Sequence, residues 1–212
     1  LTASGININA TLMFSLADYE AVAQAYLAGA RRTGDPASLA SVASFFISRV
    51  DSYTDAALER VGTAKALELR GTIAIANAKV AYARFQELFE SEGFADLAAR
   101  GTRPQRPLWA STSTKNPEYR NVLYVEELIG PNTVNTAPPA TIDEFEDHGI
   151  VKAGSLLEGI PEARALVSSL PELGVDFASV TKQLQDDGVK AFADAYESLL
   201  EAIEQKQSEV LG

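Results

Sequence analysis

Gly5-Ile-Asn-Ile-Asn-Ala-Thr-Leu-Met-Phe-Ser15 opens the first strand-to-helix unit of the chain. Residues 6–14 show no helical period, and their mostly apolar composition predicts a strand that is buried on both faces. Ser15 is a typical N-cap, and apolar residues then recur at helical spacing until Gly34-Asp35-Pro36 ends the helix. The stretch therefore predicts one βα unit.

The same alternation of strand and helix returns three times. Short apolar runs predict four strands in all, near residues 6–13, 42–48, 107–111 and 133–136. This alternation implies a parallel α/β sheet covered by helices. Because a closed TIM (β/α)8 barrel needs eight strands and about 250 residues, we expect consecutive strands of about its second half, followed by C-terminal helices. A small doubly wound sheet fits the same pattern, although no glycine-rich nucleotide loop follows any strand.

Helices are predicted where apolar residues recur at helical spacing, at residues 65–89, at residues 141–147 and over most of the chain after Pro161. Gly71 is the weak point of the first pattern. Breaks are expected at residues 171–174 and near Gly188. Residues 122–129 fit a helix or a strand, and their two glutamates favour a helical turn.

The composition excludes several classes of protein. A formal net charge of -11 argues against a dedicated nucleic-acid surface, which needs Lys and Arg. The chain has no cysteine and one histidine, so thiolate and histidine-rich metal sites are excluded, and a reducing cytosol fits. No run approaches the roughly 20 apolar residues of a membrane span, and no signal peptide is apparent. We expect one cytoplasmic domain over residues 1–212, and we expect it to be incomplete because the chain starts with Leu1 inside a motif.

Polar residues near the predicted strand ends are the candidates for function, because ligands meet the carboxyl ends of strands in such folds. Three clusters qualify: Asn7, Asn9 and Thr11; Ser44 and Arg49; and the run 111–117 with Ser111 and Lys115. Each has a structural explanation too, namely local hydrogen bonds, an ion pair of Arg49 with Asp51 or Asp55, and a polar turn before Pro117. Two cations at two strand ends suit a phosphorylated small molecule.

Four further residues have chemistry worth weighing. A desolvated lysine can attack a carbonyl and form a Schiff base, and Lys115 is the first candidate from the sequence alone. His148 is expected to cap the C-terminal end of a helix rather than to act as a base. Glu126 and Glu127 are expected to be a solvated pair rather than proton donors.

Five motifs, in order, resemble the transaldolase family. Gly5 to Ser15 resembles the family's signature around the fifth barrel strand, and Ser41-Val-Ala-Ser-Phe-Phe-Ile-Ser-Arg-Val-Asp51 resembles its sixth. Leu108-Trp-Ala-Ser-Thr-Ser-Thr-Lys-Asn-Pro117 resembles the seventh. Tyr124-Val-Glu-Glu-Leu-Ile-Gly-Pro and Thr133-Val-Asn-Thr-Ala-Pro138 are similar to the segments around the eighth. The Trp-Ala-Ser-Thr form points to the branch found in many bacteria and in plants.

The resemblance implies a transferase of the pentose phosphate pathway. Such enzymes move a dihydroxyacetone unit through a Schiff base from a ketose phosphate, such as fructose 6-phosphate or sedoheptulose 7-phosphate, to an aldose phosphate such as erythrose 4-phosphate. They need no metal and no organic cofactor. By residue, Asn9 is similar to a group that holds a dihydroxyacetone hydroxyl, and Thr11 to the one that positions the catalytic water. Ser44 resembles a second hydroxyl-binding group, and Phe46 the aromatic wall beside the Schiff base.

Arg49, Ser111 and Lys115 resemble the phosphate clamp of the family, although many relatives have Arg where Lys115 stands. An anion beside Lys115, with the Ser111 and Thr112 hydroxyls as expected partners, would keep its ammonium charged and make it a poor nucleophile.

The family's Schiff-base lysine and acid/base carboxylates lie on strands that precede this motif set. We therefore expect the chain to begin after the lysine-bearing strand, and to be inactive alone. The alternative is a non-catalytic half-barrel that binds sugar phosphate or pairs with another chain.

Overall fold

The four predicted strands form one parallel sheet. The computed structural model describes residues 1–211. Its strands are β1 (Ile8–Met13), β2 (Ser41–Phe46), β3 (Arg106–Ala110) and β4 (Val134–Thr136). They lie in the order β1-β2-β3-β4, and each neighbouring pair is parallel. The predicted direction and order are confirmed, and this α/β arrangement is consistent with the TIM-barrel family.

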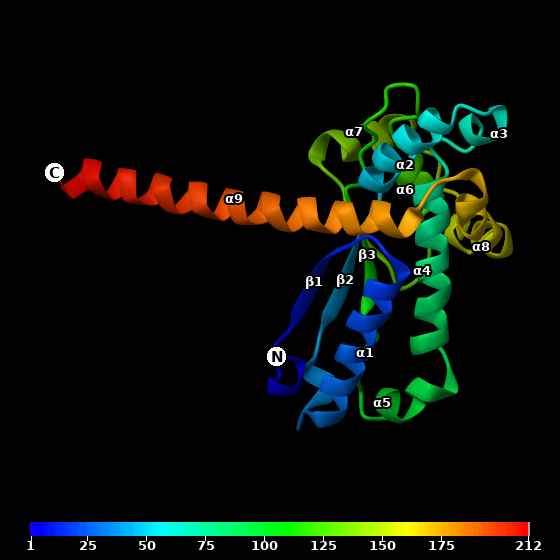
Figure 1. Cartoon of the computed structure of the whole chain (residues 1–212). Helices are drawn as coiled ribbons and strands as arrows, with labels where there is room; N and C mark the ends of the chain where they lie inside the picture. Colours follow the sequence, from blue (N-terminus) through cyan, green and yellow to red (C-terminus); the bar gives the residue numbers. More distant parts are fainter. Residues whose placement is uncertain (212) are drawn as a thin grey trace.

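Helices and short 3-10 turns connect the strands (Figure 1). The α-helices are α1 (Leu16–Arg32), α2 (Ser48–Val61), α3 (Ala64–Leu67), α4 (Ile73–Phe89), α5 (Ala95–Ala99), α6 (Leu123–Glu127), α7 (Pro139–His148), α8 (Ile160–Ser169) and α9 (Phe177–Leu211). The 3-10 turns are η1 (Thr2–Ser4), η2 (Pro36–Ser38), η3 (Glu92–Phe94), η4 (Ser155–Leu157) and η5 (Leu170–Leu173). Ser15 caps α1 as predicted, because its side chain accepts a hydrogen bond from the Asp18 N–H at 3.1 Å.

Three strand ends differ from the prediction, each for a local backbone reason. β1 begins later because Gly5 turns the chain in the left-handed region, with φ of 77°. β2 ends at Phe46 because α2 already begins at Ser48. β3 ends at Ala110, and the next residue, Ser111, leaves the extended region with φ of 59°.

Two glycines behave differently from the prediction. The single helix predicted over residues 65–89 is wrong, because Gly71 has φ of 72° and separates α3 from α4. The break predicted near Gly188 is also wrong, since α9 continues through it. A β-carbon at Gly188 would lie 3.0 Å from Leu12 Cδ2, so the glycine allows α9 to approach β1 closely. The break at residues 171–174 and the helical turn within 122–129 are confirmed.

The two faces of the sheet have different surroundings. Phe45 of β2 and Trp109 of β3 are each 1% exposed and pack edge to face, with ring centroids 6.3 Å apart. Tyr19 of α1 packs on the same Phe45 ring. Asn9 and Thr11 of β1 belong to the opposite face of the sheet, and both are exposed. The helices α1 and α4 therefore cover one face and leave the other uncovered (Figure 1).

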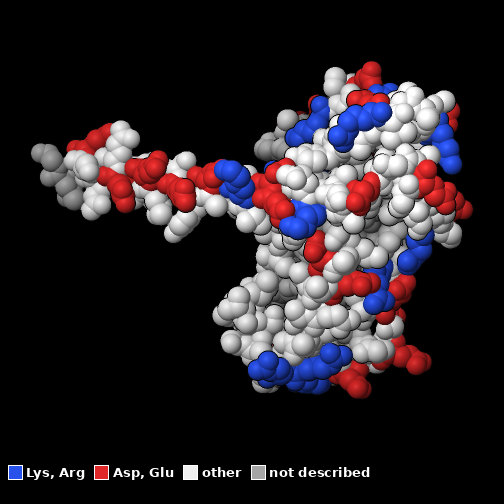
Figure 2. Space-filling view, viewed as in Figure 1, with Lys and Arg blue, Asp and Glu red and all other residues white. Residues whose placement is uncertain are grey.

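Helix α9 is unlike the other helices. It runs for 35 residues, and its C-terminal half projects from the body (Figure 1). Its exposed apolar residues recur at helical spacing, at Val189, Phe192, Tyr196, Leu199 and Ile203. Figure 2 shows acidic side chains alternating with uncharged ones along this projection. Over residues 1–211, no helix combines the length and apolarity that a membrane span requires.

Candidate functional site

The uncovered face of the sheet carries the first group of predicted site residues. The Ser44 hydroxyl of β2 donates a hydrogen bond of 2.6 Å to Asn9 Oδ1 of β1. This contact leaves the Asn9 amide nitrogen as the side-chain donor that can reach a ligand hydroxyl. Thr11 follows two residues later and is exposed on the same strand. Asn7 has the structural role that we considered for this cluster, because its oxygen accepts from the Ala40 N–H at 2.7 Å.

The carboxyl ends of β2 and β3 are joined by hydrogen bonds. The Ser48 N–H donates to the Ser111 carbonyl at 3.0 Å, and the two serine hydroxyls lie 2.9 Å apart. Ser111 is held there in the left-handed region, which is uncommon for a residue other than glycine. Arg49 follows Ser48 directly in the first turn of α2. Arg49 and Ser111, two of the three predicted phosphate-binding residues, are thereby brought to one end of the sheet.

Arg49 lies against an aromatic ring rather than a carboxylate. Its guanidinium carbon is 5.5 Å from the centroid of the Phe46 ring, a cation–π contact. The predicted alternative, an ion pair with Asp51 or Asp55, is wrong because both carboxylates are bonded elsewhere. Within residues 1–211 no carboxylate pairs with Arg49, so its exposed guanidinium can bind an anion.

Lys115 has a different partner from the expected ones. Its ammonium donates to Ser113 Oγ at 2.9 Å, whereas Ser111 and Thr112 were expected. Thr112 is fully buried and donates to Asn135 Oδ1 of β4 at 2.8 Å. No contact in the described part of the chain joins Lys115 to Arg49.

Two buried aspartates of α2 are functional candidates that the sequence analysis missed. Asp51 is 1% exposed, and burial raises the pKa of its carboxyl to about 7. Asp55 lies one turn later, and burial raises its pKa as well. The available signal was the spacing of two carboxylates at i and i+4 on the apolar side of the helix, beside Val50 and Leu58.

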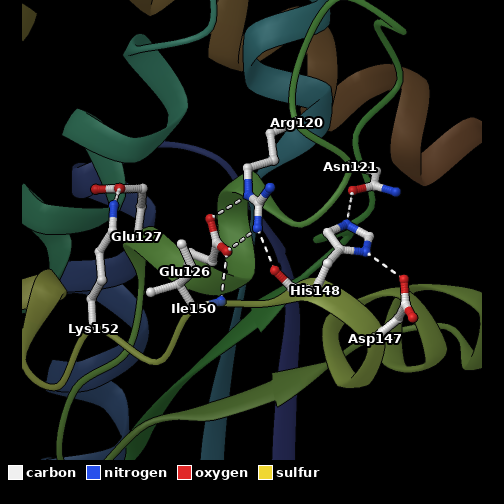
Figure 3. Close-up of polar contacts among 8 residues, drawn as sticks. All are labelled: Arg120, Asn121, Glu126, Glu127, Asp147, His148, Ile150 and Lys152. Carbon is white, nitrogen blue, oxygen red and sulfur yellow. Dashed lines mark hydrogen bonds and ion pairs between the residues drawn. The ribbon is translucent and has the colours of Figure 1, made fainter.

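Glu126 and Glu127 are not the solvated pair that we expected (Figure 3). Glu126 is 3% exposed and accepts two hydrogen bonds from Arg120, at 2.8 and 2.9 Å, and one from the Ile150 N–H at 2.8 Å. Because Arg120 stabilises the charged form, the pKa of Glu126 is lowered. Glu127 pairs with Lys152 at 2.6 Å. These contacts tie α6 to the chain after α7, which is a structural role.

His148 is the last residue of α7, as predicted, but Gly149 is the cap residue, and the His148 ring lies between two polar partners instead (Figure 3). Nε2 is 2.8 Å from Asn121 Oδ1, and Nδ1 is 3.3 Å from Asp147 Oδ2. Arg120 donates to the His148 carbonyl at 2.6 Å. The histidine therefore belongs to the same structural cluster as Glu126.

A hollow of about 600 Å³ lies toward the other end of the sheet. Its lining includes Asn7 and Asn9 of the β1 region, Val42, Arg103 and Arg106. Arg49, Ser111 and Lys115 do not line it, so the predicted phosphate group and this hollow occupy different ends of the strands. Among residues 1–211, no cluster of three His, Cys, Asp or Glu side chains is arranged to hold a metal ion.

These features define an α/β protein with a parallel sheet whose polar side chains gather on the open face and at the carboxyl ends. The chain matches the family described as Transaldolase/Fructose-6-phosphate aldolase over residues 1–203, and it belongs to that family.

Individual relatives agree with the family assignment. The chain is 47% identical over 208 residues to a protein named transaldolase from Parafrankia sp. (strain EAN1pec), covering 96% of this chain and 56% of that protein. It is 48% identical over 204 residues to a transaldolase from Mycolicibacterium paratuberculosis, covering 94% of this chain and 55% of that protein. A transaldolase from Thermobifida fusca is 45% identical over 208 residues, which are 96% of this chain and 56% of that protein. The chain thus spans about half the length of the curated relatives it matches.

Proposed function

We propose that the protein carrying this chain is a transaldolase. It would transfer a dihydroxyacetone unit between sugar phosphates, through a Schiff base, in the pentose phosphate pathway. Family membership and the names of the relatives support the reaction class. The observation that carries the proposal is the Ser48–Ser111 contact, which brings Ser111 beside the first turn of α2, where Arg49 is free of carboxylate partners.

In this proposal the chain supplies the second half of a (β/α)8 barrel as one unit over residues 1–212. Four consecutive parallel strands in sequence order support this assignment. The uncovered face would then be the barrel interior, and the ends of β2 and β3 would form the mouth where substrates enter.

The proposed roles follow from where the side chains lie. Arg49 and Ser111 bind the substrate phosphate, since a guanidinium can grip two phosphate oxygens at once. Lys115 is the third, most peripheral phosphate ligand. Asn9 and Ser44 hold hydroxyls of the dihydroxyacetone unit, and Thr11 positions the catalytic water. Phe46, which already packs under Arg49, forms the wall beside the imine.

The amine for the covalent step is proposed to lie outside these 212 residues. Attack of a lysine amine on the ketose carbonyl expels water and forms a protonated imine, which accepts the electron pair of the broken carbon–carbon bond. The strands β1, β2, β3 and β4 carry no lysine, aspartate or glutamate. Lys115 is bonded to Ser113 on an exposed loop, and such an ammonium is not desolvated.

Borohydride trapping of the complete gene product with fructose 6-phosphate tests this proposal. We expect a dihydroxyacetone adduct on a lysine beyond residues 1–212, and neither adduct nor turnover for a polypeptide of residues 1–212 alone. An adduct on Lys115 would contradict the assignment.

A second arm of the experiment tests phosphate binding. We expect Arg49→Ala to raise the KM for fructose 6-phosphate by at least tenfold, because a hydrogen bond to a charged group contributes about 1.5–3 kcal/mol. Arg60→Ala, at the other end of the same helix, is the matched control.

The absence of lysine and carboxylate from strands β1 to β4 also fits the alternative function, a non-catalytic half-barrel that binds sugar phosphate or pairs with another chain. Phosphate-sensitive binding of fructose 6-phosphate with no trapped imine on any lysine would favour it.

A further inference from the structure

We propose that Asp51 and Asp55 are positioning residues of the phosphate site. Through Tyr124 and Tyr119 they hold segment 111–124, which carries Ser111 and Lys115, against helix α2, which carries Arg49. The inference rests on the proposed function, because it takes the substrate phosphate as the ligand of these three residues.

Asp51 joins three parts of the chain inside the core. Its Oδ1 accepts from the Ala74 N–H at 2.7 Å, in the first turn of α4, and its Oδ2 accepts from the Tyr124 hydroxyl at 2.8 Å. Asp51 and Tyr124 are each 1% exposed. Because both residues are buried, water cannot replace the Tyr124 hydroxyl, and its removal would leave Asp51 Oδ2 without a hydrogen-bond donor. The pair therefore fixes the C-terminal end of segment 111–124 to α2.

Asp55 repeats this arrangement one helical turn later. Its Oδ1 accepts from the Gly71 N–H at 3.0 Å, and its Oδ2 accepts from the Tyr119 hydroxyl at 2.6 Å. The Tyr119 ring lies directly on Gly71, where an added β-carbon would be 2.8 Å from Tyr119 Cζ. Gly71 also has φ of 72°, a conformation that favours glycine. Any other residue at this position would therefore be strained and would displace the tyrosine ring.

The two aspartates act on a segment whose other end is also fixed. Ser111 is bonded to Ser48 at the start of α2, and Thr112 is bonded to Asn135. Lys115 thus lies between an anchor at residues 111–112 and a second at residues 119–124, and both anchors involve α2. The spacing between Arg49 and the hydroxyl and ammonium groups of the segment is set by these contacts. The phosphate site takes its residues from α2 and from segment 111–124, so its geometry is kept only while these two parts of the chain hold the same relative position.

Removal of the two phenol hydroxyls from the complete gene product tests the inference. We expect Tyr119→Phe with Tyr124→Phe to raise the KM for fructose 6-phosphate, and the inhibition constant of inorganic phosphate, on the order of tenfold, with little change in kcat. In a protein that already carries Arg49→Ala, the two tyrosine changes should raise these constants by a smaller factor than they do in the wild type, because the residues act on one ligand.

Tyr26→Phe is the matched control. It also removes a phenol hydrogen bond, of 2.6 Å to the Arg103 carbonyl, but near the amino end of β3. We expect it to leave both constants unchanged, although it costs comparable thermal stability.

Two further variants separate positioning from folding. Asp55→Asn should keep phosphate affinity, since its amide oxygen can accept from Gly71 and its nitrogen can donate to Tyr119, whereas Asp55→Ala should lose it. Gly71→Ala should weaken phosphate affinity without removing any polar group, because it displaces the Tyr119 ring.

The outcomes are distinguishable. If Arg49→Ala weakens phosphate binding but the tyrosine variants match Tyr26→Phe, or Asp55→Asn behaves like Asp55→Ala, the positioning role is wrong and the proposed function stands. If Arg49→Ala itself changes neither constant, the proposed phosphate site is wrong, and the positioning role falls with it.

Discussion

The two faces of the sheet come from alternate residues of the same strands, yet they have different surroundings. On one face Phe45 and Trp109 pack against aromatic neighbours and are almost fully buried. On the other, Asn9 and Thr11 are exposed and Phe46 lies partly open beneath Arg49. The comparison teaches that neighbouring residues of one strand, such as Phe45 and Phe46, can serve stability and binding separately. Substitutions on the covered face should therefore mainly lower stability, and substitutions on the open face should mainly weaken binding.

Trp109→Ala should have the largest effect on stability. Loss of a large buried aromatic side chain costs about 3–5 kcal/mol of unfolding free energy. Phe46→Ala on the open face, as the control, should cost about 1 kcal/mol, because part of that ring is already exposed. Denaturant titrations of both variants measure the difference. Equal losses would show that the open face is packed as tightly as the covered one.

Asn9→Ala should change function more than stability. We expect kcat/KM for fructose 6-phosphate to fall at least tenfold, or about 1.4 kcal/mol, because both the ligand contact and the Ser44 hydrogen bond are lost. Asn7→Ala is the control, since Asn7 bonds only to the Ala40 backbone. Steady-state kinetics of the two variants of the complete gene product decide the point. A similar loss for Asn7→Ala would assign both residues a structural role.

Asp51→Asn should change how stability depends on pH. The folded-state pKa of about 7 exceeds the ordinary value of 3.8, so the folded protein holds a proton that the unfolded chain releases. This contribution is fully present below pH 4 and is lost as pH rises through 7. Asn cannot titrate, so the variant should lose less stability than the wild type between pH 5 and pH 8, by roughly 2–3 kcal/mol.

Unfolding free energies of both proteins at the two pH values measure this difference. Asp55, which titrates in the same direction, and Tyr124 are present in both proteins, so their contributions largely cancel. A wild-type stability that rises over this range relative to the variant would contradict the assigned direction of the Asp51 shift.

Phe192→Ala on α9 should have the smallest effect. The side chain is 57% exposed, and surface substitutions usually change stability by less than about 0.5 kcal/mol. Leu184 lies on the same helix but is 2% exposed, so Leu184→Ala should cost about 2–5 kcal/mol. Thermal unfolding of the 212-residue polypeptide compares the two. A large loss for Phe192→Ala would mean that another surface covers it.

Local sequence signals were sufficient for the strand order, the Ser15 cap and the gathering of Arg49 and Ser111 at one end of the sheet. These depend on neighbouring residues and on the rule that parallel strands end at the same edge. The aspartates of α2 could not be found in this way, because their tyrosine partners lie 64 and 73 residues away. Gly71 and Gly188 show the same limit. Gly71 has φ of 72° and breaks a helix beside the Tyr119 ring, whereas Gly188 stays helical against Leu12, and both neighbours are distant in sequence.

Helix α9 also determines how the chain moves through solvent. At about 1.5 Å per residue, its 35 residues form a rod of roughly 50 Å, half of it beyond the body. Such a rod adds friction out of proportion to its mass. A calibrated gel-filtration column would therefore overestimate the mass of a monomer. Light scattering, which is insensitive to shape at this size, gives the true subunit count.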